Sequence, residues 1–424
     1  MKKIYAVFLS TLLFTSCLND FLDVDPVSDI ATSTFWQTDN DVRAALNSVY
    51  ADFQTNYNKN SAGNYMTWFE MRSDNFVGTT VSSSMPTYAA NTNKLNSSHV
   101  SADWNVWYKS ISTVNYALHY IPDVQGLTAI NKDNYLAEAY FLRAFCYFNL
   151  VRAFGEVPLI DFKVGSVADA NIPKSSVAQI YTLIDEDLTN AESYLPRTWE
   201  AQYVGRLSWG AARALHARTY MMRNDWNNMR AAAEDVISSG LYNLKTPYED
   251  IFREKGENCG ESVLELQCTA TAALPGSNEI GSQYAQVQGC RGAGEWNLGW
   301  GQHTPTQLLA DAFEEGDPRK DETLLYFIRT GEDPSTIPAN KHYGEKPVAN
   351  ADVIAKYFNK KVYTDPALRE KYTKSGYWVN IRLIRYSDVV LMAAEAACEL
   401  GDNTSARRYL EMVRARARGT NANI

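Results

Sequence analysis

Two segments of the 424-residue chain combine aromatic rings with hydrogen-bonding side chains, and neither has helical or strand periodicity. The first spans residues 68–75 and continues as a polar loop to residue 88, and the second is a glycine-rich stretch at 291–302. Flat aromatic rings stack on the C–H faces of sugars, and fixed polar groups bind sugar hydroxyls. These segments, with one ring from a neighbouring helix, therefore predict a carbohydrate site. The candidate ligand-binding residues are Trp296, Trp300, Asn297, Gln302, Trp68, Arg72, Asp74, Asn75, Tyr88 and Trp104.

Trp296 and Trp300 are the leading candidates within this set. Glycine neighbours are expected to leave the faces of both rings uncovered, and no periodicity asks for a large ring at either position. Asn297 and Gln302 lie beside them as partners for hydroxyl groups. Other tryptophans are expected to be structural, namely Trp107, Trp226 and Trp378.

A search for catalytic and metal-binding patterns finds none that predicts an enzyme. There is no GxSxG, Walker A, HExxH or CxxC sequence, and Gly292-Ala293-Gly294 lacks the third glycine of a dinucleotide fingerprint. Glycoside hydrolysis needs two carboxylates at a suitable separation, and Asp74 with Glu295 is the one pair in the aromatic segments. We expect no cofactor and no metal. The other acidic clusters are expected to be solvated surfaces: Asp185, Glu186, Asp187, Glu314, Glu315 and Asp317.

Cys17 has a different chemistry, because the residues before it resemble a bacterial lipoprotein signal. Lys2 and Lys3 follow the first methionine, a short apolar run comes next, and Thr15-Ser16 precede the cysteine. This pattern predicts a signal peptide at 1–16, acylation of the Cys17 thiol with a fatty acid such as palmitate, and a lipid tether at 17–38. The mature protein is then anchored to a membrane rather than spanning it.

The other cysteines are expected to have structural roles. Cys146 and Cys398 lie in apolar helical patterns and are predicted to be small core residues. Cys259, Cys268 and Cys290 lie in loop-rich sequence, where the odd number argues against a disulfide framework and a single bridge stays open.

The amino-acid composition narrows the class of protein further. Apolar residues make up 45% of the chain and charged residues 21%, which is typical of a globular protein. The formal charge of −9 would repel a phosphate backbone, so nucleic-acid binding is excluded as a general function.

Helical periodicity dominates both ends of the chain. The predicted helices cover residues 39–57, 104–121, 134–154, 177–195, 208–222, 228–239, 386–400 and 404–418. The helix at 134–154 is apolar almost all round, so it is predicted to be buried. The last two pairs, 208–239 and 386–418, have small residues at matching positions and resemble tetratricopeptide repeats.

The middle of the chain differs, because about 242–376 is rich in glycine, proline and short alternating runs such as 262–267. The predicted fold class is mostly α, with tetratricopeptide-like helix pairs in an α-α superhelix and a large irregular loop-rich insertion. Residues 39–424 are expected to form a single helical domain.

The order of several motifs carries a family resemblance. After the cysteine come Phe-Leu-Asp-Val-Asp-Pro at 21–26, Gly-Glu-Val-Pro-Leu-Ile at 155–160, Gly205-Arg206 before an alanine-rich helix pair, and two related helical stretches at 381–396 and 410–417. Together they resemble the SusD/RagB family of Bacteroidetes outer-membrane nutrient-binding lipoproteins, along essentially the whole chain from Cys17.

The resemblance implies a surface-exposed lipoprotein of the cell outer membrane that captures a polysaccharide or oligosaccharide without being an enzyme. It also implies a partner, a SusC-type TonB-dependent transporter on which the protein sits as a lid. A peptide-binding lipoprotein of the RagB type is the alternative, and a surface glycoside hydrolase is a second one. Family members usually continue beyond the point that corresponds to Ile424, so the family's C-terminal part is expected to be missing here.

Overall fold

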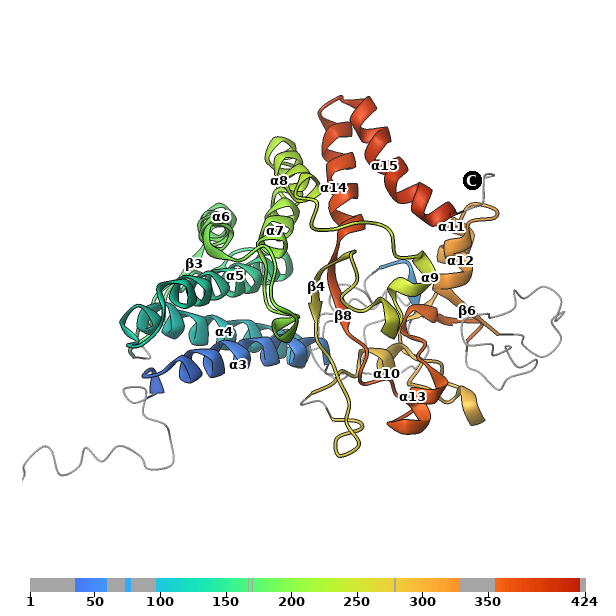
Figure 1. The fold of residues 1–424 in the computed structure, drawn as a ribbon, viewed down its shortest axis with the longest axis horizontal. Coiled ribbons are helices and arrows are strands. Elements are labelled where there is room, and N and C mark those ends of the chain that lie inside the picture. The colour runs from blue at the N-terminus through green and yellow to red at the C-terminus, as the bar shows by residue number, and fades with distance from the viewer. Residues whose placement is uncertain are drawn as a thin grey trace, which may run out of the picture.

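The computed structural model describes residues 35–58, 73–77, 97–166, 168–169, 171–277, 280–327 and 355–419 (Figure 1). Four of the predicted functional residues, Cys17, Trp68, Arg72 and Tyr88, lie outside these ranges. The described part is mostly α-helical, which confirms the predicted fold class.

An array of long helices forms the left and upper part of Figure 1. Each helix packs on its neighbour in the chain, and α14 then packs on α8, so the last pair continues the array after a long excursion. The helices are α3 (Asp39–Asn58), α4 (Ser97–Tyr120), α5 (Ala129–Phe154), α6 (Val177–Tyr194), α7 (Trp209–Met221), α8 (Trp226–Ser238), α14 (Tyr386–Glu399) and α15 (Asn403–Arg418).

The predicted helix ends agree closely with these bounds, except at two starts. Helix α4 begins at Ser97, before the predicted Trp104. Helix α5 begins at Ala129 rather than 134, because the Thr128 hydroxyl accepts a hydrogen bond from the Asn131 amide at 3.1 Å and caps the helix. Gly155 directly follows the predicted end of the helix at residue 154, and it ends α5 with a φ of +72°.

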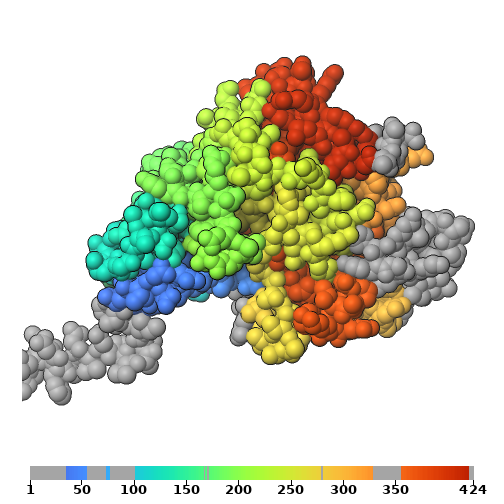
Figure 2. Space-filling view, in the orientation of Figure 1, coloured from blue at the N-terminus to red at the C-terminus, as the bar shows by residue number. Residues whose placement is uncertain are grey.

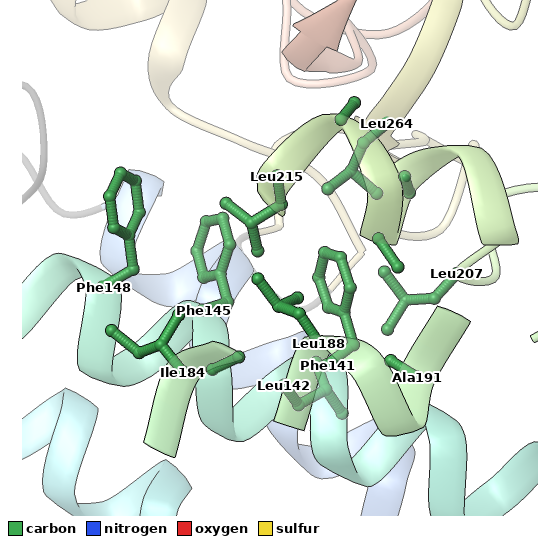
Figure 3. Packing of buried hydrophobic residues seen from close by; sticks show 14 of the residues in the cluster. Phe141, Leu142, Phe145, Phe148, Ile184, Leu188, Ala191, Leu207, Leu215 and Leu264 are labelled. Carbon is green, nitrogen blue, oxygen red and sulfur yellow. The ribbon is translucent and has the colours of Figure 1, made fainter. Parts of the chain in front are cut away.

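The buried helix is α5, as its all-round apolar sequence predicted. Its rings pack where α5, α6, α7 and one strand meet (Figure 3). Phe141 and Phe148 are almost fully enclosed, and Ile184 and Leu188 of α6 cover the same region. Burial of this kind stabilises each such side chain by about 1.5–3 kcal/mol, so packing rather than helix propensity holds the array together.

Buried ion pairs show that two acids were wrongly expected to be solvated. Asp187 is only 1% exposed, because it faces α5 and accepts hydrogen bonds from Nε and Nη2 of Arg143, both at 2.8 Å. Asp317 is also buried and pairs with Arg319 at 2.6 Å. Both carboxylates tolerate burial because an arginine neutralises them.

The region between α8 and α14 contains short elements that lie in the right-hand part of Figure 1. Its short helices are α9 (Tyr248–Ile251), α10 (Tyr284–Gln288), α11 (Gln307–Ala312), α12 (Pro318–Thr323) and α13 (Pro366–Lys371). Its 3₁₀ turns include Glu254–Gly256, Gly294–Trp296 and Lys360–Val362.

The strands of the described part form two-stranded antiparallel pairs. Strand β4 (Ser262–Leu266), which lies within the alternating run, pairs with β8 (Ile381–Arg385), which leads directly into α14. The other pairs are β6 (Leu324–Tyr326) with β7 (Tyr357–Asn359), β1 (Phe76–Val77) with β5 (Thr304–Pro305), and β2 (Val157–Pro158) with β3 (Lys174–Ser175).

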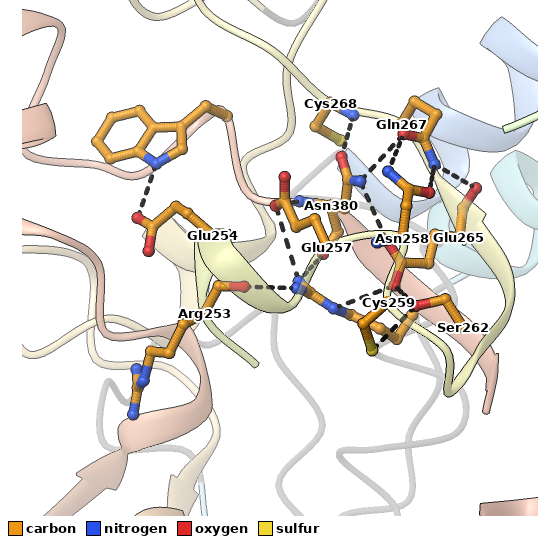
Figure 4. Close-up of polar contacts among 12 residues, drawn as sticks. Arg253, Glu254, Glu257, Asn258, Cys259, Ser262, Glu265, Gln267, Cys268 and Asn380 are labelled. Atoms are coloured by element: carbon orange, nitrogen blue, oxygen red, sulfur yellow. Dashed lines mark hydrogen bonds and ion pairs between the residues drawn. The ribbon is translucent and has the colours of Figure 1, made fainter. Parts of the chain in front are cut away.

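Polar contacts fix the β4–β8 pair to the segments around it (Figure 4). Asn380 is central: its side-chain oxygen accepts from the backbone N–H of Cys268 at 2.7 Å, and its own backbone N–H donates to Glu257 at 2.8 Å. Glu261 is fully buried and accepts from Arg385 at 2.7 Å, and it also pairs with Arg416 of α15. These contacts join the irregular region to the helical array.

The described cysteines are all free thiols, so no bridge joins Cys259, Cys268 and Cys290. Cys146 is fully buried, as predicted. The expectation for Cys398 is wrong, since this residue is exposed. It lies seven residues after Leu391 on α14, and that spacing puts both side chains on the outward face of the helix.

Candidate functional site

The loop that carries Trp296 and Trp300 is held by backbone hydrogen bonds to α10. The amide of Trp300 donates to the carbonyl of Gln286 at 2.8 Å, and the amide of Gln302 donates to that of Val287 at 3.0 Å. At Gly299 a Cβ atom would lie 2.3 Å from the Gln286 carbonyl oxygen. Glycine is therefore needed there for close backbone contact, which is a different role from the predicted one of leaving ring faces open.

The expectation that the faces of Trp296 are uncovered is wrong. The residue is only 4% exposed, at the centre of a small hydrophobic cluster. Phe327 meets its ring edge-on with centroids 5.0 Å apart, and Tyr363 stacks on it at 6.0 Å. Both neighbours come from parts of the chain distant in sequence, so local spacing could not reveal the burial. The buried Trp296 ring therefore fixes the loop to this hydrophobic cluster.

Trp300 is half-buried, and its surroundings agree better with the prediction. Gln302 is also half-buried, and its side-chain oxygen is enclosed by the protein without a hydrogen-bond partner among the described residues. Asn297 is exposed. The loop therefore presents one half-buried indole ring and two amide side chains, of Asn297 and Gln302.

The pairing of β1 with β5 brings the first aromatic segment to the second. Phe76 lies opposite Pro305, and the Thr306 amide donates to the Asn75 carbonyl at 2.9 Å. The Thr306 hydroxyl donates to the Asp74 carbonyl at 3.0 Å. Asp74 and Asn75 are exposed, and their backbone carbonyls lie next to Thr306, four positions after Gln302.

The structure does not bring Trp104 to this loop by any contact of the described residues. Its half-buried ring packs in the helical array, 4.8 Å from the Tyr108 ring and 5.2 Å from that of Phe154. Asp74 and Glu295, the carboxylate pair considered for hydrolysis, are both exposed. The general acid of a glycosidase usually lies in an apolar, enclosed pocket, and these two side chains lack such surroundings.

Two hollows, which the sequence did not predict, flank the loop before α7. One has a volume of about 290 Å³ between α3, α5 and β4, and the other has about 300 Å³ between residues 198–208 and β4. Arg206 lies at the border of both. It pairs with Glu138 of α5, whose other oxygen accepts from the Tyr50 hydroxyl at 2.8 Å.

Burial dominates the electrostatics of this cluster. It raises the pKa of Glu138 and that of Tyr50, while Arg206 acts in the opposite direction on both groups. The sequence signal for this cluster is Gly205-Arg206, preceded by two aromatic residues, Trp199 and Tyr203.

The part of the chain that the structure describes contains neither a candidate metal site nor a candidate membrane-spanning helix. No three His, Cys, Asp or Glu side chains there are grouped as metal ligands. None of the helices in the described ranges has the length and apolar character needed to cross a bilayer.

Family models and individual relatives that resemble this chain all belong to SusD-like proteins. Residues 20–221 match a family model described as "Starch-binding associating with outer membrane", and residues 261–423 match the model of the SusD family. SusD-like protein P2 of Formosa agariphila is 29% identical over 438 residues, which cover 99% of this chain and 82% of that protein.

Solved structures agree with this result. A laminarin-binding SusD-like protein superposes with a TM-score of 0.72 at 25% identity, covering 90% of this chain and 85% of the other. Surface glycan-binding protein A from Bacteroides thetaiotaomicron, solved in complex with laminarihexaose, gives a TM-score of 0.72 over 90% of this chain and 83% of its own. At 21% identity, the second likeness shows the fold alone.

Proposed function

Because the chain belongs to the SusD/RagB family, we propose that it is a surface glycan-binding lipoprotein that passes its ligand to a SusC-type TonB-dependent transporter. Family membership supports the class of protein. The accessible Trp300 ring beside polar loop residues supports a carbohydrate ligand, since stacking and hydroxyl contacts are what a sugar needs. Fatty-acid attachment at Cys17 and the transporter partner belong to the same proposal.

One observation carries the assignment of the site, namely the pairing of β1 with β5. It joins residues 76–77 to residues 304–305, which are more than 200 positions away in the chain. Asp74 and Asn75 then lie next to Thr306, four positions after Gln302, and this supports a site that they share with Trp300 and Gln302. We assign ligand contacts to these four residues and to Asn297.

Laminarin is the first glycan to test. The laminarin-binding relative shares the fold and 25% of its residues with this chain. A linear glucan offers repeated flat ring faces to a single indole platform, and each stacked ring contributes on the order of 1 kcal/mol beyond simple burial.

Calorimetric titration with laminarihexaose tests this assignment. We expect Trp300→Ala to lower the affinity about tenfold, because about 1.4 kcal/mol corresponds to a factor of ten. Trp226→Ala is the matched control, since it removes another half-buried indole at the start of α8. Its affinity should equal that of the wild type. Equal affinity for Trp300→Ala and wild type would place the site elsewhere.

Binding without cleavage is the second half of the proposal. Incubation of the protein with laminarin should release no new reducing ends, whereas steady release would favour the hydrolase alternative. A peptide panel titrated in parallel addresses the RagB-type alternative. Peptide binding with no glycan binding would contradict the proposed ligand class.

A further inference from the structure

The hollow between residues 198–208 and β4 has the composition of a binding site and lies apart from the Trp300 loop. Its wall contains three aromatic residues, Trp199, Tyr203 and Tyr242, and its volume of about 300 Å³ is at the lower end of the usual range for ligand sites. In Figure 2 the green atoms of the helical array meet the yellow atoms of the segment after α8 along this part of the surface.

The Trp199 ring is fixed in place before any ligand arrives. Its indole nitrogen donates to the Leu207 carbonyl at 2.7 Å, and the Arg206 guanidinium covers one face at 3.9 Å from the ring centre. Tyr203 meets the ring edge-on at 6.0 Å. Trp199 and Tyr203 both stay half-exposed. A rigid aromatic wall loses little entropy when a ligand binds.

Polar groups around this wall have spare hydrogen-bonding capacity. Arg206 uses only Nη2 for its ion pair with Glu138, so Nε and Nη1 have no protein partner among the described residues. The hydroxyls of Tyr203 and Thr198 likewise have no partner there. Unpaired donors beside exposed ring surface are the combination that a sugar recognises.

Charge indicates what kind of sugar fits. The positive charge of Arg206 is balanced by Glu138, which is 1% exposed and lies directly behind it. Glu200 adds an exposed carboxylate to the rim. An acidic sugar would be repelled by Glu200 and would find no uncompensated cation in Arg206, whereas a neutral sugar meets neither difficulty.

We propose that this hollow is a second carbohydrate-binding site, for a neutral hexose unit, formed by Trp199, Tyr203 and Arg206. The inference rests on the proposed function in one respect, that the protein binds glycans. Two sites on one protein let a repeating polysaccharide gain affinity through multivalent binding when its chain reaches both, without new contacts at either site.

The experiment uses laminarihexaose and maltohexaose as probes, titrated into the full chain and its variants. In the Trp300→Ala background we expect residual binding, which Tyr203→Ala should weaken a further threefold to tenfold. Tyr194→Ala is the matched control, since this tyrosine at the end of α6 is 54% exposed and lies outside the hollow. Tyr203→Phe keeps the ring and should lose less affinity than Tyr203→Ala.

The outcomes separate this inference from the proposed function. Complete loss of binding in Trp300→Ala, or residual binding that Tyr203→Ala leaves unchanged, would overturn the second site and leave the first intact. Wild-type binding that depends on Tyr203 but not on Trp300 would support the second site and contradict the first. Failure of both probes to bind the wild type would contradict both. Thermal melts of each variant identify any that fail to fold, and Tyr203→Phe then supplies the decisive comparison.

Discussion

Trp296 and Trp300 stand four positions apart in one loop, and the structure gives them opposite surroundings. Trp296 is enclosed by Phe327 and Tyr363, whereas Trp300 keeps accessible surface beside Gln302. The difference arises from neighbours that are remote in sequence, since the local glycines are common to both. We therefore expect substitution of the two tryptophans to affect different properties.

Trp296→Ala should lower the free energy of unfolding by about 3–5 kcal/mol, because it removes a buried ring and leaves a cavity. Urea unfolding followed by circular dichroism measures the change. Trp300→Ala in the same assay should unfold close to the wild-type midpoint, since its ring is only half-buried. A wild-type midpoint for Trp296→Ala would show that its ring is not part of the core.

At the scale of elements, the contact between α6 and α7 contains a buried titratable group. His216 of α7 is 2% exposed, with Nδ1 at 2.7 Å from Glu192 and Nε2 at 3.4 Å from Asp185, both on α6. Arg213 and Arg223 pair with the same two carboxylates. Burial lowers the pKa of His216, but the two carboxylates outweigh it, so the pKa is raised overall.

The raised pKa predicts that the fold loses stability as the pH rises. Folding makes His216 bind its proton more tightly, so the stabilisation is full below the ordinary pKa of about 6.5 and is lost as the pH passes the raised value. As the pH rises through this range, the melting temperature of the wild type should fall, and that of His216→Gln should fall less. The exposed His119 provides a control, and His119→Gln should keep the wild-type profile. Identical pH profiles for His216→Gln and the wild type would contradict this role.

The buried pair of Arg143 and Asp187 ties α5 to α6 and also reaches α4. Arg143 donates to Asn115 of α4 at 2.9 Å in addition to its two bonds to Asp187. Removal of one partner leaves an uncompensated buried charge, so Arg143→Ala should cost about 3–5 kcal/mol in unfolding free energy.

A surface pair supplies the comparison for Arg143. Lys174 and Glu156 form an ion pair at 2.7 Å whose side chains are 66% and 48% exposed. Solvent screens such a pair, so Lys174→Ala should leave the urea midpoint almost unchanged. Equal costs for Lys174→Ala and Arg143→Ala would show that the buried pair has no special role.

At the scale of the whole molecule, the irregular region and the helical array are joined by continuous structure. Strand β8 runs directly into α14, and the buried Glu261 beside β4 contacts Arg385 and reaches Arg416 on α15. The candidate binding loops therefore project from a rigid scaffold. Such a scaffold positions loop residues for binding while its own helices stay fixed.

Attachment to the membrane is predicted to depend on one atom, the Cys17 sulfur. Cys17→Ala should abolish fatty-acid labelling and move the protein from the membrane fraction to the soluble fraction. Cys398→Ala removes the exposed thiol of α14 and should leave both results as in the wild type. Labelling that persists in Cys17→Ala would contradict the predicted anchor.

The sequence alone determined the helices, because their signals are local. Apolar residues at helical spacing predicted the course of α5 and α6, and Gly155 marked the end of α5 from its position alone. The loop-rich stretch and the family resemblance were also readable without coordinates. The grouping of residues 72–75 with residues 296–302 stays a prediction from chemistry, and among the described residues Asp74 and Asn75 contact Thr306.

Only the tertiary structure decided which of these residues are accessible. Trp296 is covered by rings from 31 and 67 positions further along the chain, and Asp187 is buried because α5 places Arg143 against it. The hollow beside Trp199 likewise needs β4 as its opposite wall. Periodicity reports which side of an element is apolar, but burial depends on which distant element packs there, and local spacing does not contain that information.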